Sequence, residues 1–132
     1  MCFFAFNLNI AIYMYLRYSG ERSAMFELVI YKTSTEKEPF NEWLSSLDKS
    51  VLGQVMSRID RLQDGYLGKA KALKDGLFEI KFKSPAFRIY YVMIGRQVVL
   101  LLTAGDKTSQ FRDIKKARDY LKDYRRRYEK KC

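Results

Sequence analysis

The spacing of apolar residues changes along the chain and predicts helices before most of the strands. Residues 26–31 are a short run of β-branched and aromatic residues, typical of a strand. Apolar residues then recur at helical spacing over residues 39–47 and again over residues 51–62. Gly65 suits the residue that follows a helix end. This part of the chain therefore predicts one strand and two antiparallel helices joined by a tight turn.

Beyond a connection over residues 66–76, the period changes from helical to alternating. Residues 77–83 and 86–94 alternate apolar and polar side chains, as strands with one solvated face do. Gly95 and Arg96 fit a two-residue hairpin turn, and the apolar run over residues 98–102 predicts a central strand covered on much of both faces. The alternation assigns one face to Phe78, Ile80, Phe82, Phe87, Ile89, Tyr91 and Met93, and the other to Glu79, Lys81, Lys83, Arg88, Tyr90 and Val92.

A last helix is predicted after a loop over residues 103–109. Its apolar side would consist of Phe111, Ile114, Ala117, Leu121, Tyr124 and Tyr128. The predicted order is β-α-α-β-β-β-α. The predicted fold class is α+β, with a small, mostly antiparallel β-sheet packed on one face by the N-terminal helical pair. We expect two layers, with only partial cover over the face of the sheet that carries the polar residues.

Residues 1–24 differ from the rest of the chain, with six Phe and Tyr residues and three charged residues. Their apolar run is shorter than the ~20 residues of a membrane span, and the basic start of a signal peptide is missing. We interpret them as an extension that results from a start assigned too early, with Met25 as the natural initiator. A secretory signal, or a genuine anchor or added strand, are the alternatives. Residues 25–132 are expected to form a single domain.

The composition indicates a folded, basic domain. The 132 residues include 25 Lys and Arg against 15 Asp and Glu, a formal net charge of +10, and the 48% of hydrophobic residues exclude a disordered basic tail. A polyanion is the obvious partner, and nucleic acid is favoured over an anionic membrane. We expect a cytoplasmic protein with no membrane partner.

The residue types that are missing restrict the chemistry. The chain has no His, which excludes Ser-His-Asp and Cys-His catalysis. Its two cysteines, Cys2 and Cys132, lie at opposite ends and have no metal-ligand spacing. No glycine-rich phosphate loop is present. We therefore expect no metal and no cofactor, and any catalysis must use Lys, Arg, Tyr, Asp, Glu or Gln.

The polar face of the predicted sheet is a candidate site for phosphodiester chemistry. Glu79, Lys81, Arg88 and Tyr90 share this face, and the loop after the last strand could bring Lys107 and Gln110 over it. Arg and Lys offset the charge that develops on a phosphate, an effect of ~3–4 kcal/mol per well-placed donor. Tyr or Lys could transfer protons, and the 2′-hydroxyl of RNA could be the nucleophile. Half-solvated strands show the same alternation without any function, but an unpaired Arg88 at a strand centre would be costly.

The last helix concentrates the positive charge. Residues 107–132 hold eleven basic and four acidic residues, interleaved with tyrosines. A solvated basic helix is the ordinary interpretation, but this excess favours contact with a phosphate backbone. The candidate RNA- or phosphate-binding residues are Lys83, Gln110, Arg112, Lys115, Lys116, Arg125 and Arg126.

Four motifs in the same order resemble the RelE/ParE toxin superfamily, and most closely its HigB-like branch of phage-related addiction-module killer proteins. They are L-K-D-G-L-F-E-I-K from Leu73, F-R-I-Y-Y from Phe87, L-L-T-A-G-D-K-T-S-Q from Leu101 and D-I-K-K-A from Asp113. The resemblance runs from about Met25 to Tyr124, and residues 1–24 have no counterpart in it.

This resemblance implies the toxin of a type II toxin–antitoxin system that enters the ribosomal A site and cuts mRNA there without a metal. It implies as partners a cognate antitoxin, often a small helix-turn-helix protein that carries the complex to operator DNA, together with the ribosome and mRNA. Arg88 corresponds to the sheet arginine of the R-x-Y-Y motif, with Tyr90 or Tyr91 beside it, and Lys107 and Gln110 correspond to the G-D-K-x-x-Q motif. Lys81 stands where arginine is usual, which keeps the charge but loses the bidentate fork.

The candidate catalytic residues are therefore Lys81, Arg88, Tyr90, Tyr91 and Lys107. Two other functions remain open. A ParE-like inhibitor of DNA gyrase, without RNA cleavage, belongs to the same superfamily, and fold does not decide function. A basic RNA-binding module without catalysis would bind in a salt-dependent way and would not be toxic.

Overall fold

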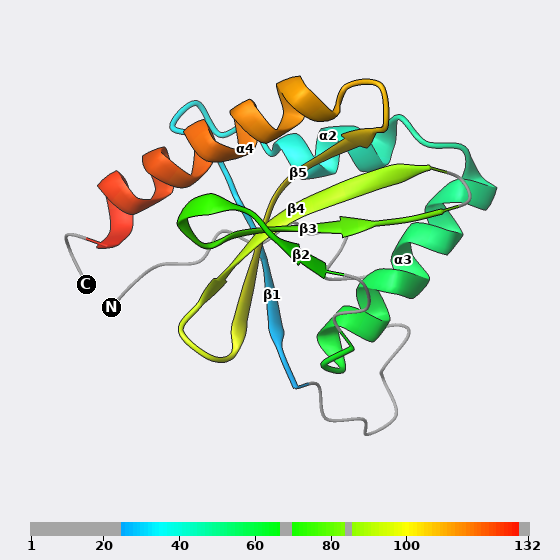
Figure 1. Cartoon of the computed structure of the whole chain (residues 1–132), viewed down its shortest axis with the longest axis horizontal. Coiled ribbons are helices and arrows are strands. Elements are labelled where there is room, and N and C mark those ends of the chain that lie inside the picture. Colours follow the sequence, from blue (N-terminus) through cyan, green and yellow to red (C-terminus); the bar gives the residue numbers. More distant parts are fainter. Residues whose placement is uncertain (1–24, 67–69, 84–85, 130–132) are drawn as a thin grey trace.

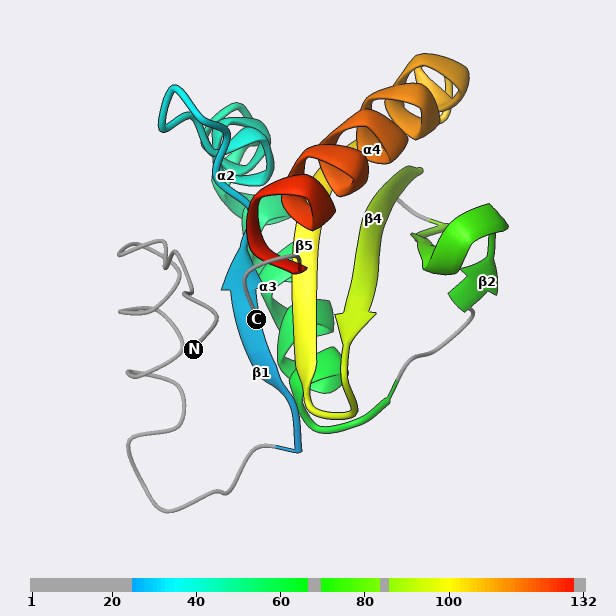
Figure 2. The same cartoon turned by 90° about the vertical axis from the view of Figure 1, so that its left-hand side faces the viewer.

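The computed structural model describes residues 25–66, 70–83 and 86–129, and these form an α+β fold around one sheet (Figure 1). The expectations for residues 1–24 and for the Ser84-Pro85 break lie outside the described residues. Two helices pack on one face of the sheet and a third crosses the other face (Figure 2). None of the helices in the described ranges is long and apolar enough to span a membrane.

The sheet has five strands in the order β1-β5-β4-β3-β2 and is mostly antiparallel, as predicted. Its central strands are β4 (Phe87–Ile94) and β5 (Val98–Asp106), which pair antiparallel, and β1 (Glu27–Ile30) pairs parallel with β5. On the other side, β3 (Leu77–Lys81) pairs with β4, and β2 (Ala70–Ala72) forms the far edge. The continuous apolar run of β5 is buried on both faces, which confirms its predicted central place.

The helices follow the predicted apolar stripes, except that Phe111 of the last helix is exposed. Helix α2 (Pro39–Ser45) begins with the proline at its first turn, where the missing N–H costs nothing. Helix α3 (Lys49–Gln63) is followed by Gly65, which adopts a φ of +100°. Helix α4 (Gln110–Tyr124) continues into a π-helical turn, η2 (Arg125–Glu129).

The sheet is covered on both faces, so the expected two-layer fold with a partly open face is wrong. On one face α2 and α3 enclose a core that includes Phe40, Ile59, Ile89 and Tyr91. On the other face Ala117, Leu121 and Tyr124 of α4 pack on Leu77, Tyr90, Val92, Leu100 and Leu102. The apolar stripe of α4 is buried against this second face of the sheet, which we call the α4 face.

Three local predictions also differ from the structure. The connection over residues 66–76 contains β2 and a 3-10 turn, η1 (Lys74–Gly76). The hairpin has three residues rather than two, because Ile94 pairs with Val98. Strand β5 continues to Asp106 through a register shift: Tyr91 pairs with Leu101, whereas Tyr90 pairs with Thr103. Such a bulge changes which face the following residues point to.

Candidate functional site

A buried polar row crosses the α4 face of the sheet on β3 and β4. Arg88 pairs with Lys81 on one side and Gly105 on the other, and Glu79 pairs with Tyr90. Arg88 Nε lies 3.5 Å from Glu79 Oε2, and the two side chains are only 8% and 5% exposed. Burial would make an unpaired Arg88 costly, and the Glu79 carboxylate, two residue pairs away along β3 and β4, offsets this cost.

Helix α4 closes this row from above. Gln110, at the start of the helix, donates from Nε2 to Glu79 Oε2 at 2.8 Å. Glu79 therefore accepts a hydrogen bond from Gln110 and forms an ion pair with Arg88, and it links two predicted site residues that lie on different elements. We call Glu79, Arg88, Tyr90 and Gln110 the buried row.

Tyr90 and Tyr91 lie on opposite faces of β4. Tyr90 belongs to the buried row and is fully buried, and this burial together with the negative charge of Glu79 raises the pKa of its hydroxyl well above the ordinary value. Tyr91 packs in the other core, where its ring stacks on Phe78, and burial raises its pKa to about 12. The structure therefore brings Tyr90 to Arg88 but not Tyr91.

The loop between β5 and α4 is held by its own side chains. Asp106 accepts hydrogen bonds from the Thr108 hydroxyl and the Ser109 amide, which keep the pKa of its carboxyl below the ordinary value. Ser109 also donates to Asp113, which is buried against Gly105. Much of the G-D-K-x-x-Q motif is therefore the scaffold that fixes the start of α4, with Lys107 carried on it.

Lys81 and Lys107 are exposed at the same end of the sheet as Arg88. Lys81 is the β3 partner of Arg88, and Lys107 follows closely after Gly105, the β5 partner of Arg88. Lys83, two residues beyond Lys81, is also exposed. These lysines add positive charge around a buried pair whose own charges cancel.

The predicted phosphate-binding residues of the last helix differ in their surroundings. Arg112, Lys115 and Lys116 are exposed. Arg125 donates to the backbone oxygen of Asp75 at 3.0 Å, and Arg126 forms an ion pair with Asp123. The last two thus have structural partners within the chain, whereas the first three face solvent.

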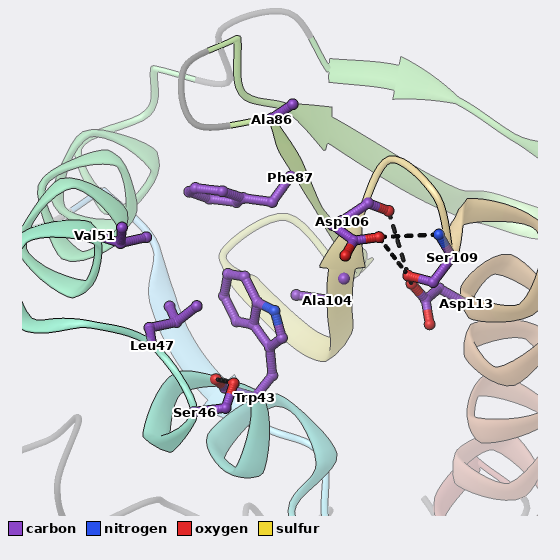
Figure 3. A pocket seen from close by; sticks show the side chains of 11 residues that line it. Trp43, Ser46, Leu47, Val51, Ala86, Phe87, Ala104, Asp106, Ser109 and Asp113 are labelled. Carbon is purple, nitrogen blue, oxygen red and sulfur yellow. Dashed lines mark hydrogen bonds between the residues drawn. The ribbon is translucent and has the colours of Figure 1, made fainter.

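A pocket of about 440 Å³ opens at the same end of the sheet, between the helical pair and the start of α4. The rings of Trp43 and Phe87 line one side, with centroids 5.3 Å apart, and Asp106, Ser109 and Asp113 line the other (Figure 3). Phe87 points to the helical pair, whereas its neighbour Arg88 points to the α4 face, so Phe87 lines this pocket and Arg88 does not.

Sequence reasoning placed Glu79 on the correct face but missed its part in the site. Its pairing with Arg88 could have been found, because opposite charges on neighbouring strands with one face in common tend to meet. The contact between Asp113 and Gly105 joins two elements and left no signal in the sequence.

Fold and site together define a basic α+β domain with a buried charged row beneath the start of its last helix. The chain belongs to the phage derived protein Gp49-like family (DUF891), whose model matches residues 42–128. The resemblance to phage-related proteins predicted from the motifs is confirmed at the level of this family.

Three further proteins are similar to the chain. A protein of Haemophilus influenzae described as uncharacterized is 37% identical over 81 residues, which cover 60% of this chain and 82% of that protein. The intact E. coli RelBE toxin–antitoxin complex aligns with a TM-score of 0.48 and 17% identity, over 64% of this chain and 96% of the matched chain. A free E. coli RelE toxin mutant aligns with a TM-score of 0.48 and 19% identity, over 69% and 93% of the two chains. At these identities the likeness to the two RelE structures concerns the fold alone.

Proposed function

We propose that this protein is the toxin of a type II toxin–antitoxin system and that it arrests translation by cutting mRNA on the ribosome. The observation that carries the proposal is the meeting of Lys81, Arg88 and Lys107 at one end of the sheet, with Gln110 above them. These are the residues that the motif resemblance assigns to the site, and membership of a phage-derived family agrees with it.

The proposed reaction needs charge stabilisation more than a protein nucleophile. The 2′-hydroxyl of the substrate attacks the adjacent phosphorus, and the bond from phosphorus to the 5′-oxygen breaks. Lys107 and Lys81, both exposed, are able to reach the phosphate and offset the charge on its oxygens. Lys81 is also the accessible candidate for proton transfer, since Tyr90 and Tyr91 are fully buried.

In this mechanism Glu79 and Gln110 are positioning residues. Glu79 holds Arg88 in the sheet through the 3.5 Å ion pair, and Gln110 holds Glu79. Tyr90 lies against the same carboxylate, and its raised pKa keeps its hydroxyl protonated at neutral pH. A phosphate that approaches Arg88 would compete with Glu79 for the guanidinium.

Translation in vitro, followed by primer extension on the mRNA, tests this function. We expect the native protein to produce cuts, and Lys107→Ala and Lys81→Ala to slow them by about 10²–10³-fold, because each removes a charged donor. Lys49→Ala is the matched control, since Lys49 is an equally exposed lysine at the start of α3. Growth arrest without mRNA cuts, accompanied by DNA damage, would contradict the proposal and indicate gyrase as the target.

We also propose a cognate antitoxin, encoded beside this gene, as the partner. The net charge of +10 suits a partner with an acidic surface. The antitoxin is expected to be a small helix-turn-helix protein through which the complex binds operator DNA. Expression that is toxic alone and harmless together with the neighbouring reading frame would support the pairing, and toxicity that persists would contradict it.

A further inference from the structure

Phe111 is an aromatic side chain that the fold leaves in solvent. It is 89% exposed, although it lies in the first turn of α4 directly after Gln110. Helical spacing predicted Phe111 on the buried side of the helix, and this prediction was wrong. Positions 110, 113, 117, 121 and 124 face the sheet, so Phe111 is one residue, or about 100°, away from that stripe.

Basic residues continue the line that Phe111 begins. Along one side of α4 and into its next turn, Phe111 is followed at helical spacing by Lys115, Arg118, Lys122 and Arg125. We call Phe111 and these four residues the basic flank. Arg118 and Arg125 donate to the backbone oxygens of Lys74 and Asp75, at 3.2 and 3.0 Å. Since η1 leads directly into β3, the basic flank lies on the β3 side of α4, where Gln110 meets Glu79.

The side of α4 opposite the basic flank is covered near the end of the helix. Tyr120 contacts Tyr31 of the region after β1, with ring centroids 5.1 Å apart. On the basic flank, Arg118 and Arg125 contact η1, and Arg118 also forms a 3.6 Å ion pair with Asp75. Phe111, Lys115 and Lys122 are exposed there. A ligand that follows this flank would pass Phe111 at the end nearest to Arg88.

The chemistry of this surface fits single-stranded RNA. Exposed aromatic rings that stack on bases, next to cations that contact the backbone, are the usual means of binding single strands. A continuous apolar patch would favour a protein partner, whereas the neighbours of Phe111 on the surface, Arg112 and Lys115, are charged.

We propose that Phe111 stacks on a base of the RNA strand whose phosphates follow the basic flank toward Arg88. This inference rests on the proposed function, because it concerns the substrate of the same site. It adds a stacking residue that fixes the position of the RNA strand on the protein. It also assigns RNA contact to Lys115 and Lys122 but not to Lys116, which lies on another side of the helix.

Fluorescence anisotropy with the full chain and a short, labelled, single-stranded RNA tests the proposal without requiring cleavage. Loss of a stacked base contact weakens binding about 5-fold or more, so we expect this effect for Phe111→Ala and near-native affinity for Phe111→Trp. Tyr66→Ala is the matched control, because Tyr66 is 71% exposed but follows α3, on the other side of the sheet. RNA with abasic positions should bind more weakly to the native protein and lose little further affinity with Phe111→Ala.

Salt dependence separates stacking from charge. Lys115→Ala should reduce the slope of log affinity against log salt by about 0.7, the value for one phosphate contact on a single strand. Phe111→Ala should leave that slope unchanged while the affinity falls. A fall in slope with Phe111→Ala would overturn the assignment of a stacking role.

The outcomes distinguish this inference from the function on which it rests. Stacking through Phe111 without any mRNA cuts would retain the RNA surface and contradict the cleavage activity. Cuts by a protein whose RNA affinity is the same with Phe111→Ala would overturn the inference alone. Phe111→Ala that binds RNA normally but no longer binds the antitoxin would also overturn it, and would assign the ring to a protein interface.

Discussion

Gly105 lies at the point where the start of α4 comes closest to β5. A Cβ added there would lie 1.8 Å from Asp113 Oδ2, so the side chains of Asp113 and Ser109 would have to move. The glycine therefore leaves room for the Asp113 carboxylate in the first turn of α4, next to Gln110. At the scale of single residues, the site depends as much on this missing side chain as on the charged ones.

We expect Gly105→Ala to lower the free energy of unfolding by about 1–3 kcal/mol, as overpacking does. Asp113→Ala in the same chain should restore part of this loss, because it removes the atom that clashes. The control is Gly53→Ala in α3, where nothing lies within 4 Å and the change should stabilise the helix by about 0.5–1 kcal/mol. Urea unfolding measures all three, and an unchanged midpoint for Gly105→Ala would show that the helix start is free to shift.

Buried tyrosines make the protein sensitive to alkali. Burial is the largest cause that raises the pKa values of Tyr31, Tyr90 and Tyr91, the last to about 12. A raised pKa in the folded state stabilises the fold below the ordinary value of ~10, and this contribution is lost as the pH rises through the folded value. We expect stability to fall above pH ~10. The absorbance of tyrosinate should show the most buried rings ionising only together with unfolding, and their ionisation in the intact fold would contradict this.

At the scale of elements, α4 is the third layer of the fold and the cover of the site. Its start is fixed by the loop around Asp106. Its far end is fixed to the segment after β1, because Asp123 accepts a hydrogen bond from the Tyr31 hydroxyl and forms an ion pair with Arg127. Burial acts to raise the pKa of Asp123, but hydrogen bonds from Tyr31, Arg127 and Arg126 outweigh it and hold that pKa below the ordinary value. The helix is thus fastened at both ends.

Asp123→Asn should destabilise the protein by about 1–3 kcal/mol at neutral pH, because it removes hydrogen bonds to a charged group. A depressed pKa contributes stability above the unfolded value of ~3.9 and loses it as the pH falls through the folded value. The difference between native protein and variant should therefore shrink below pH ~4. Asp119→Asn, on an exposed position of the same helix, is the control. A difference that stays constant from neutral to acid pH would contradict this account.

Period and alternation predicted most of these elements and the faces of their residues. Phe78, Ile80 and Phe82 do face the helical pair, and Arg88 and Tyr90 do share the opposite face. Strand β2 could not be predicted, because Ala70-Lys71-Ala72 has no strand-forming residues and is held by its pairing with β3. The packing of α4 on the second face of the sheet was not predicted, because the amphipathic pattern of a helix does not identify the surface that it packs against.

In the site, the alternation of apolar and polar residues predicted the correct face for Arg88. The residues of β5 that lie opposite it depend on a bulge. The register shift between Tyr90 and Tyr91 puts Thr103 opposite Tyr90 and Gly105 opposite Arg88, and sequence spacing contains no sign of it. Phe111 was misplaced for a simpler reason. Polar Gln110 and Asp113 occupy the first turn of the buried stripe, so the apolar pattern led to the wrong starting residue.

At the scale of the whole molecule, the two described cores are the basis for testing whether residues 1–24 are an added segment. The first is built from residues between Phe26 and Ala104, and the second from residues between Val29 and Tyr128. We expect a chain that begins at Met25 to unfold at the same urea concentration as the full chain and to bind RNA equally well. A shorter chain that fails to fold, or that unfolds at clearly lower urea, would contradict the interpretation of residues 1–24 as an added segment.

The parallel pairing of β1 with β5 has a consequence for the order of synthesis. Among the described strands, the first to be translated lies beside the last one, and β5 also lies between β1 and the β4–β3–β2 part of the sheet. Until residues 98–106 have left the ribosome, β1 and the β2–β3–β4 part of the sheet are not joined. The core on the α4 face forms only after α4 has also been synthesised. A nascent chain, or one translated from a broken message before this point, therefore lacks Lys107 and Gln110 and the cover of α4. The protein gains its shape only when its synthesis is nearly complete.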